Sequence, residues 1–352
     1  MWLKSELYKK EMKKIAQSDI IPWDNLDGRS ILITGATGLI GTAITNALLS
    51  VREERNLNII IYAIVRDEEK ARKIFGEQSE RIGLNIIKHS DIQNPLKIQK
   101  TVHYIIHGAN PTDSSFFVNN PVETAKTAFL GTVNILDFAY KKKIESMVFL
   151  STMEVYGYPE KGHKVLESEI GSFSPTKVRN CYPISKQMCE NLCYSYFAEY
   201  TVPIKILRLT QTLGVGVNYN DKRVFAEFAR CAIEKRDIVL KTKGLTERSY
   251  LDISDAVTAI LLVLLKGKNG EAYTVANEDT YCSIYEMAKL VADKYGIKVR
   301  IEEEDTTKFG YADTLYMDLD TTKLKKLGWY PQYSIIETYQ KMIEQMDDKE
   351  FK

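Results

Sequence analysis

The sequence is poor in several features that mark special classes of protein. Its 352 residues include only five cysteines, with no short repeated spacing, and nine prolines. Such a cysteine set does not suggest a disulfide framework and fits a reducing compartment. The longest apolar stretch, at 256–265, falls short of the roughly 18 to 20 residues of a membrane helix. We therefore expect a soluble, cytoplasmic protein without a membrane partner.

An excess of charge of one sign is missing as well. The 48 lysines and arginines balance 47 aspartates and glutamates, which leaves a net charge of +1 and no general attraction for nucleic acid. The four histidines form no cluster with the cysteines, so no metal site is expected. Hydrophobic residues make up 44% of the chain, enough at this length for a large core in two domains, or in one domain with a lobe.

Apolar strands alternate with helices along the first two thirds of the chain. Strands are predicted at 30–36, 58–65, 84–90, 102–109, 146–152 and 203–209, and the main helices at 39–49, 122–142 and 181–200. Strands that are apolar on both faces are typical of a parallel sheet covered by helices on both sides. We predict an α/β fold, a Rossmann-like doubly wound parallel sheet with a smaller C-terminal α/β substrate lobe. An additional surface helix is expected before the first strand.

The segment TGATGLIG at 34–41 joins the first strand to the first helix of this pattern. Glycines there allow a tight turn and let a pyrophosphate approach the backbone amides at the helix N-terminus, where the helix dipole favours anions. The alternative is a glycine-rich connection without a ligand, which the strand–turn–helix context disfavours. The motif predicts a dinucleotide site that includes Gly35, Thr37, Gly38, Leu39, Ile40 and Gly41.

The end of the second strand bears on the choice between NAD and NADP. An acidic side chain there accepts a hydrogen bond from the ribose 2′-hydroxyl of NAD, whereas arginine pairs with the 2′-phosphate of NADP. Val65 stands where an acid is often found, and Arg66 and Asp67 follow. Arg66 slightly favours NADP; alternatively Arg66 is solvated and Asp67 reaches the ribose. Asp91, followed by Ile92, is predicted to contact the adenine, or else to cap a helix.

A second motif, Tyr182-Pro-Ile-Ser-Lys186, places a phenol and an ammonium on one face of a helix. A nearby ammonium lowers the pKa of a tyrosine from about 10, so Tyr182 can serve as a base on a hydroxyl group. This spacing is common by chance. It gains meaning here because Thr152 ends an earlier strand and the glycine motif opens the sheet.

The three motifs GATGLIG, STMEVYG at 151–157 and YPISK at 182–186 resemble, in this order, the extended short-chain dehydrogenase/reductase family. The resemblance is to its NAD-dependent epimerase/dehydratase group, which acts on nucleotide sugars, and it covers about residues 29–346. It implies that Thr152, Tyr182 and Lys186 are catalytic. It also implies that Gly108 and Ala109, in the HGANP segment, line the cofactor.

The resemblance also implies an organisation for the whole chain. We expect an N-terminal helical extension at 1–28, followed by an NAD(P)-binding Rossmann domain at 29–209 plus 246–266. The nucleotide-sugar lobe would comprise 210–245 plus 267–352. A homodimer is expected through the helices at 122–142 and 182–200.

Residues that follow Thr152 distinguish subclasses of the family. Glu154 stands where sugar 4,6-dehydratases and UDP-glucuronate decarboxylases carry a glutamate, and a carboxylate there can remove the C5 proton once C4 is a ketone. Its alternative role is a structural hydrogen bond. Met153 replaces the aspartate that protonates the leaving hydroxyl in dTDP-glucose 4,6-dehydratases, so that scheme is disfavoured. Met153 can instead form an apolar wall of the substrate pocket.

Other segments favour the decarboxylase branch. The stretch at 220–233 resembles its nucleotide-binding segment, with Arg223 as a diphosphate contact, and Arg248 matches an arginine that meets the diphosphate or supports chemistry at the sugar. Departures include Gln211, which is a predicted substrate contact, and Ala128, both where asparagine is usual. We expect an NAD(P)-dependent dehydratase or decarboxylase of nucleotide sugars. A 4-epimerase and a catalytically inactive NAD(P)-binding sensor are the alternatives. The residue usage is typical of AT-rich bacterial genomes, which associates the chain with polysaccharide biosynthesis.

Overall fold

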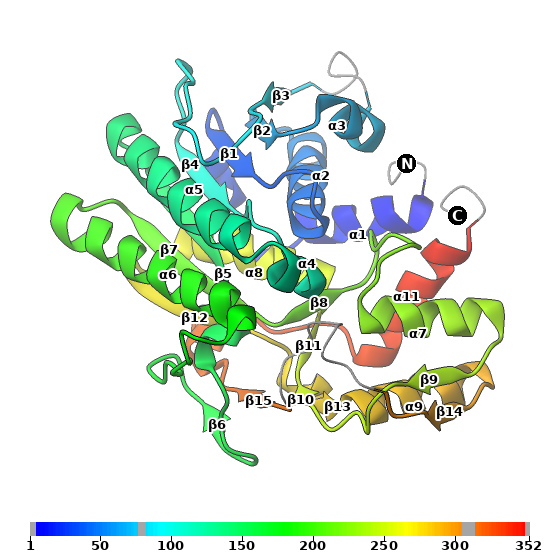
Figure 1. Ribbon diagram of the computed structural model, residues 1–352. Helices are drawn as coiled ribbons and strands as arrows, with labels where there is room; N and C mark the ends of the chain where they lie inside the picture. The colour runs from blue at the N-terminus through cyan, green and yellow to red at the C-terminus, as the bar shows by residue number, and fades with distance from the viewer. Residues whose placement is uncertain (1–4, 77–81, 305–313, 349–352) are drawn as a thin grey trace.

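The computed structural model describes residues 5–76, 82–304 and 314–348 (Figure 1). Residues 1–4 of the predicted extension, and 305–313 and 349–352 of the predicted substrate lobe, lie outside the described residues. No helix in the described part of the chain has both the length and the apolar character needed to cross a membrane.

A seven-stranded sheet forms the centre of the molecule, with the strand order β12–β7–β5–β4–β1–β2–β3. Every neighbouring pair in this sheet is parallel, which confirms the predicted doubly wound fold. Its strands are β1 (Ser30–Thr34), β2 (Ile60–Val65), β3 (Leu84–Lys88), β4 (Tyr104–His107), β5 (Ser146–Thr152), β7 (Ile204–Leu209) and β12 (Glu271–Val275).

Two hydrophobic cores lie on opposite faces of this sheet, because successive side chains of a strand point to opposite sides. In β1, Ile31 and Ile33 belong to one core and Leu32 to the other. The first core is covered by α1 (Glu6–Ala16), α2 (Leu39–Glu54), α3 (Glu68–Phe75) and α8 (Ile253–Lys266). The second is covered by α5 (Pro121–Lys142) and α6 (Cys181–Tyr200), which lie side by side in Figure 1.

The smaller lobe is built from short strands and three amphipathic helices around a third core. The helices are α7 (Val224–Glu234), α9 (Ile284–Tyr295) and α11 (Ile335–Asp347), and short α4 (Ser114–Asn119) and α10 (Thr322–Lys325) lie elsewhere. The strands are β6 (Lys164–Val165), β8 (Gln211–Leu213), β9 (Ile238–Leu240), β10 (Glu247–Arg248), β11 (Tyr250–Asp252), β13 (Cys282–Ser283), β14 (Val299–Ile301) and β15 (Tyr316–Leu319).

Four strands differ from the division drawn from the sequence. The strands β6, β10 and β11 fall within its Rossmann ranges but pair with strands of the smaller lobe. That division leaves 267–352 entirely in the smaller lobe, whereas β12 pairs along its full length with β7 and forms an edge of the large sheet. The reason is that α8 packs across β5 and β7 and returns the chain to the sheet edge. The chain therefore contributes one more strand to the large sheet before it enters the smaller lobe.

The segment before β1 forms the helix expected from the sequence. Ser5 caps α1 by accepting a hydrogen bond from the Tyr8 amide at 3.2 Å, which satisfies one of the free amides of the first turn. Tyr8, Met12 and Ile15 are buried in the first core against α2. The extension is therefore an integral layer of the large domain.

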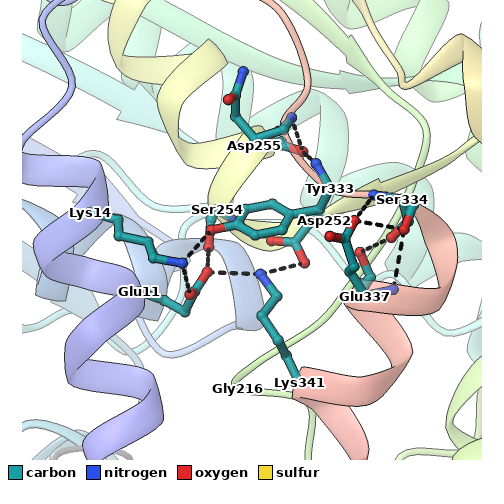
Figure 2. Close-up of polar contacts among 12 residues, drawn as sticks. Glu11, Lys14, Gly216, Asp252, Ser254, Asp255, Tyr333, Ser334, Glu337 and Lys341 are labelled. Atoms are coloured by element: carbon teal, nitrogen blue, oxygen red, sulfur yellow. Dashed lines mark hydrogen bonds and ion pairs between the residues drawn. The ribbon is translucent and has the colours of Figure 1, made fainter.

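A buried ionic cluster joins α1 to the start of α8 and to α11 (Figure 2). Glu11, whose side chain is 1% exposed, lies 2.7 Å from the ammonium of Lys341 on α11 and 3.0 Å from that of Lys14. Its carboxylate also accepts from the Ser254 hydroxyl at 3.1 Å, and Lys341 lies 3.1 Å from Asp252. The cluster therefore joins the N-terminal helix, the start of α8 and the C-terminal helix.

Candidate active site

The predicted site residues follow strands that are neighbours in the large sheet. Thr34 of β1 lies opposite His107 of β4, and His107 lies opposite Phe149 of β5. The carboxyl ends of parallel strands meet at one edge, where ligands bind in folds of this type. This edge therefore brings together the glycine loop after Thr34, the turn after His107 and the residues that follow Thr152.

The glycine loop has the shape of a phosphate cradle. Gly35 adopts φ +71°, and a Cβ atom there would lie 2.8 Å from the carbonyl oxygen of Gly108, so a side chain is excluded. A Cβ at Gly41 would overlap the Gly35 carbonyl oxygen, which shows how closely α2 approaches the loop. Gly38 is the N-cap residue of α2 and brings no side chain to cover the helix terminus. These residues fit the pyrophosphate of a dinucleotide.

Thr34 fixes the second wall of this cradle. Its hydroxyl oxygen accepts hydrogen bonds from the amides of Gly108 and Ala109, both at 3.2 Å, and lies 2.7 Å from Nδ1 of His107. Burial, with a smaller contribution from Lys186, lowers the pKa of His107 to about 3, so the imidazole is neutral at physiological pH. The predicted cofactor residues Gly108 and Ala109 are thus held beside Gly35 by a neutral network.

The residues predicted to contact the adenosine part of the cofactor lie in different local environments. Asp67 is the N-cap of α3 and accepts from a backbone amide of its first turn at 2.9 Å, while Arg66 is exposed at the end of β2. Asp91 accepts from the amide two residues later at 2.9 Å inside a turn, and the alternative of a capped helix is wrong because no helix begins there. Ile92 is buried against Gly131 of α5.

Tyr182, Lys186 and Thr152 are all buried where α6 crosses the end of β5. Burial raises the pKa of Tyr182, Glu154 raises it further, and the hydroxyl of Thr152 and the charge of Arg179 oppose this. The Lys186 ammonium donates to the Leu150 carbonyl oxygen at 2.8 Å. Burial, and not this ammonium, therefore dominates the pKa of Tyr182, which differs from the lowering expected from the sequence.

Glu154 is paired with a residue that the sequence did not single out. One guanidinium nitrogen of Arg179 lies 3.0 Å from Oε2 of Glu154, and the other donates to Oε1 at 3.1 Å. Both side chains line a small pocket at the start of α6, next to Pro183, the residue after Tyr182. Other residues of this pocket are Tyr158, Phe173, Pro183 and Met317.

The predicted substrate residues fall into two groups. Met153 is buried in an apolar cluster and its sulfur accepts from the Thr210 hydroxyl at 3.2 Å, so it packs beneath the site. Gln211 begins β8 and is half-buried. Arg223 pairs with Asp221 at 2.6 Å at the start of α7. By contrast, Nε of Arg248 is buried and has no hydrogen-bond partner among the described residues, which marks it as a group available to a ligand.

The model of the NAD-dependent epimerase/dehydratase family matches residues 31–276, more than half of the chain. The chain belongs to this family. The match begins at β1 and ends after β12, so it spans the whole seven-stranded sheet of this epimerase/dehydratase family member.

Curated relatives match nearly the full length of this family member. UDP-glucuronic acid decarboxylase 5 of Arabidopsis thaliana is 30% identical over 312 residues, which cover 87% of this chain and 86% of the relative. UDP-glucuronic acid decarboxylase 1 of Xenopus tropicalis is 28% identical over 322 residues, which cover 90% of this chain and 72% of the relative.

Solved structures share the fold at lower identity. The NAD complex of dTDP-glucose 4,6-dehydratase from Bacillus anthracis superposes with a TM-score of 0.76 at 21% identity, over 92% of this chain and 97% of that one. UDP-glucose 4-epimerase from Thermotoga maritima gives a TM-score of 0.73 at 22% identity, over 90% and 98% of the two chains. These likenesses establish the fold shared by this family member.

Sequence reasoning missed three residues of the site. Arg179 lies in a short 3₁₀ turn, Val178–Asn180, which has no chemical signature. Phe117 of α4 stacks on the Tyr182 ring with centroids 4.2 Å apart, a contact that no pattern in the sequence reveals. Both amide atoms of Asn110 are buried without a partner in the described part of the chain. The position of Asn110 directly after the cofactor residues Gly108 and Ala109 was the available signal.

Proposed function

We propose that this chain is an NAD(P)-dependent enzyme that oxidises a nucleotide sugar at C4 and then acts on the 4-keto intermediate. The observation that carries the proposal is the burial of Thr152, Tyr182 and Lys186 at the sheet edge that also holds the glycine loop. The decarboxylases among its relatives support UDP-glucuronate as substrate and decarboxylation as the outcome.

In this reaction the chain's own residues manage protons and orientation. Tyr182 removes the proton of the 4-hydroxyl group, and Thr152 donates a hydrogen bond to the same oxygen. Lys186 contributes positive charge to the buried site and is held by the Leu150 carbonyl oxygen. The glycine loop with Gly108 and Ala109 would hold a dinucleotide cofactor, which would supply the hydride transfer at C4 that these residues cannot perform.

Decarboxylation follows from oxidation because the C6 carboxylate then lies β to a ketone. The C5–C6 bond breaks, carbon dioxide leaves, and the electron pair remains on C5 and the C4 oxygen as an enolate. Tyr182, now protonated, donates a hydrogen bond to that oxygen, and C5 takes a proton derived from solvent. Tyr182 then returns its proton to the 4-oxygen as C4 is reduced again, so the overall reaction is redox-neutral.

Glu154 favours a second candidate, a 4,6-dehydratase. A carboxylate in the pocket beside Tyr182 is placed to remove the C5 proton of a neutral 4-keto sugar, after which the 6-hydroxyl group leaves. Met153 has no proton to give to that hydroxyl group, so the leaving oxygen would need another acid. This weakens the dehydratase relative to the decarboxylase.

The same proposal includes a choice of cofactor. Asp67 is engaged as the cap of α3, and Arg66 is exposed at the end of β2, an arrangement that leaves room for the 2′-phosphate of NADP. Four of the solved structures that share the fold contain NAD. We propose NAD(P) binding with Arg66 favouring NADP. A cytoplasmic location and a role in polysaccharide biosynthesis remain predictions from the sequence.

A homodimer through α5 and α6 is also proposed. These helices pack together, with the rings of Tyr140 and Tyr200 4.9 Å apart, and they leave large apolar side chains exposed. Burial of such side chains against a second copy would stabilise a dimer. Sedimentation velocity is expected to give twice the mass of the chain, and a monomer at micromolar concentration would exclude this interface. The exposed side chains are Val122, Tyr140, Met188, Tyr194 and Tyr200.

Mass spectrometry of the products tests the proposed reaction. The purified protein would be incubated with UDP-glucuronate and with UDP-, dTDP-, GDP- and CDP-hexoses, and its bound cofactor would be identified after denaturation. Loss of carbon dioxide from UDP-glucuronate is the expected result, whereas loss of water would establish the dehydratase. An unchanged mass with a shifted retention time would identify an epimerase. No change in any substrate, with cofactor bound, would favour the catalytically inactive sensor.

A further inference from the structure

Arg179 holds the carboxylate of Glu154 in a two-armed ion pair in the lining of the pocket. The two nitrogen–oxygen distances are 3.0 and 3.1 Å, and the side chains are 12% and 23% exposed. Charge-assisted pairs of this fork geometry fix orientation as well as charge. Both oxygens of the candidate C5 base are therefore already engaged.

The position of Arg179 does not depend on Glu154 alone. Its guanidinium carbon lies 5.0 Å from the ring centre of Phe117, and Phe117 stacks on Tyr182 with an interplanar angle of 7°. Asn180, the next residue, is buried and donates to the Ser174 carbonyl oxygen at 3.0 Å. Packing and hydrogen bonding thus hold the guanidinium in place on a rigid turn immediately before α6.

A carboxylate in such a fork can take a proton only after it gives up at least one of these hydrogen bonds and its attraction to the guanidinium. The two candidate reactions pass through different 4-keto intermediates, one with a hydroxyl group and one with a carboxylate at C6, and they make different demands on Glu154. Dehydration requires a base that removes the C5 proton. Decarboxylation requires none, because the electron pair on C5 comes from the C5–C6 bond.

We propose that Arg179 is a positioning residue that prevents Glu154 from removing C5 protons, so that the 4-keto intermediate of UDP-glucuronate loses carbon dioxide without exchange or inversion at C5. This inference rests on the proposed function, since it concerns the fate of the intermediate formed there. The restraint protects the product as well. After carbon dioxide leaves, C5 of the 4-keto pentose carries acidic protons, and the restrained carboxylate leaves them in place until hydride returns to C4.

Deuterium labelling at C5 tests the restraint directly. UDP-glucuronate would be converted in D₂O, and the pentose product would be returned to H₂O before its mass is measured. The wild type is expected to give a product with one deuterium at C5, which enters when the enolate is quenched. Arg179→Met, which removes the fork but keeps an apolar stem, is expected to give mainly two deuteriums at C5. The double variant Arg179→Met/Glu154→Gln is expected to return to one.

Controls separate this effect from loss of structure. Arg236→Met removes an exposed arginine just after α7 that pairs with Glu227 and Glu234 of that helix. This control variant is expected to give one deuterium at C5. A gain of label that depends on Glu154 is not produced by a merely unfolded or weakened site. If Arg179→Met is too unstable to purify, Arg179→Lys keeps the charge with a single contact and should give an intermediate level.

Each outcome is decisive. Two deuteriums in the wild-type product, or one in Arg179→Met, would overturn the restraint while leaving the proposed function intact. Loss of water from a neutral nucleotide sugar by the wild type would also overturn it, because that reaction needs a free base at C5. Absence of any product from UDP-glucuronate and every other sugar would instead refute the proposed function itself.

Discussion

Tyr182→Phe is expected to lower turnover by about three orders of magnitude while the protein remains folded and retains its cofactor. General acid–base groups contribute roughly 10²- to 10⁴-fold to rates, and this variant removes the only hydroxyl proposed to take the proton of the substrate's 4-hydroxyl group. The phenylalanine ring keeps the stacking contact with Phe117, 4.2 Å between centroids, so the local packing is preserved.

The measurement is the rate of product formation by mass, together with the cofactor content of the purified variant. Tyr285→Phe is a matched control, because Tyr285 is exposed on α9 and far from the glycine loop in the fold. It should leave the rate unchanged. Turnover by Tyr182→Phe within tenfold of the wild type would exclude Tyr182 as the base.

The second large effect is expected at the buried ionic cluster of Figure 2. Lys341→Met leaves the carboxylates of Glu11 and Asp252 without their shared ammonium, and their side chains are 1% and 0% exposed. Removing one partner of a buried pair typically costs about 3–5 kcal/mol in the free energy of unfolding. Lys14→Met removes another partner of Glu11, but its side chain is 48% exposed, and we expect a loss of less than about 1 kcal/mol.

Denaturant unfolding of the two variants measures this difference. Burial alone would raise the pKa of Glu11, but Lys341 and its hydrogen bonds reverse the shift, and the net pKa is lowered. The stabilisation from ionised Glu11 is therefore present above its ordinary pKa of 4.5 and is lost as the pH falls below it. Equal destabilisation by Lys341→Met and Lys14→Met at neutral pH would contradict the role assigned to burial.

Much of the fold could be predicted because its signals are local. Strands that are apolar on both faces, such as β1 and β5, indicate a parallel sheet, and the glycine motif gives the first turn and its ligand. The strand β12 was assigned to the smaller lobe together with the rest of 267–352, because the regular alternation of strands and helices weakens in the last third of the chain. Its place depends on pairing with β7, more than sixty residues earlier, which no local pattern records.

The site was harder to predict because its chemistry depends on distant pairings. The spacing of Tyr182 and Lys186 revealed a shared helix face, but not that the Lys186 ammonium donates to the Leu150 carbonyl oxygen. Arg179 pairs with Glu154 across 25 residues of chain, and only the meeting of a 3₁₀ turn with the end of β5 brings them together. Sequence can supply the residue types of such a pair but not their geometry.

The ion pair between Glu11 and Lys341 has a consequence for synthesis of the protein. The two residues are 330 positions apart, so Glu11 leaves the ribosome long before its partner exists. At a synthesis rate of roughly 5–20 residues per second, that delay is about 15 s to a minute. During this time α1 can pack its apolar face, but its buried carboxylate has no Lys341. The outer layer of the large domain therefore reaches its final stability only when the last helix is complete. In a chain that stops before α11, the helix α1 would be held less firmly because Glu11 lacks the Lys341 ammonium.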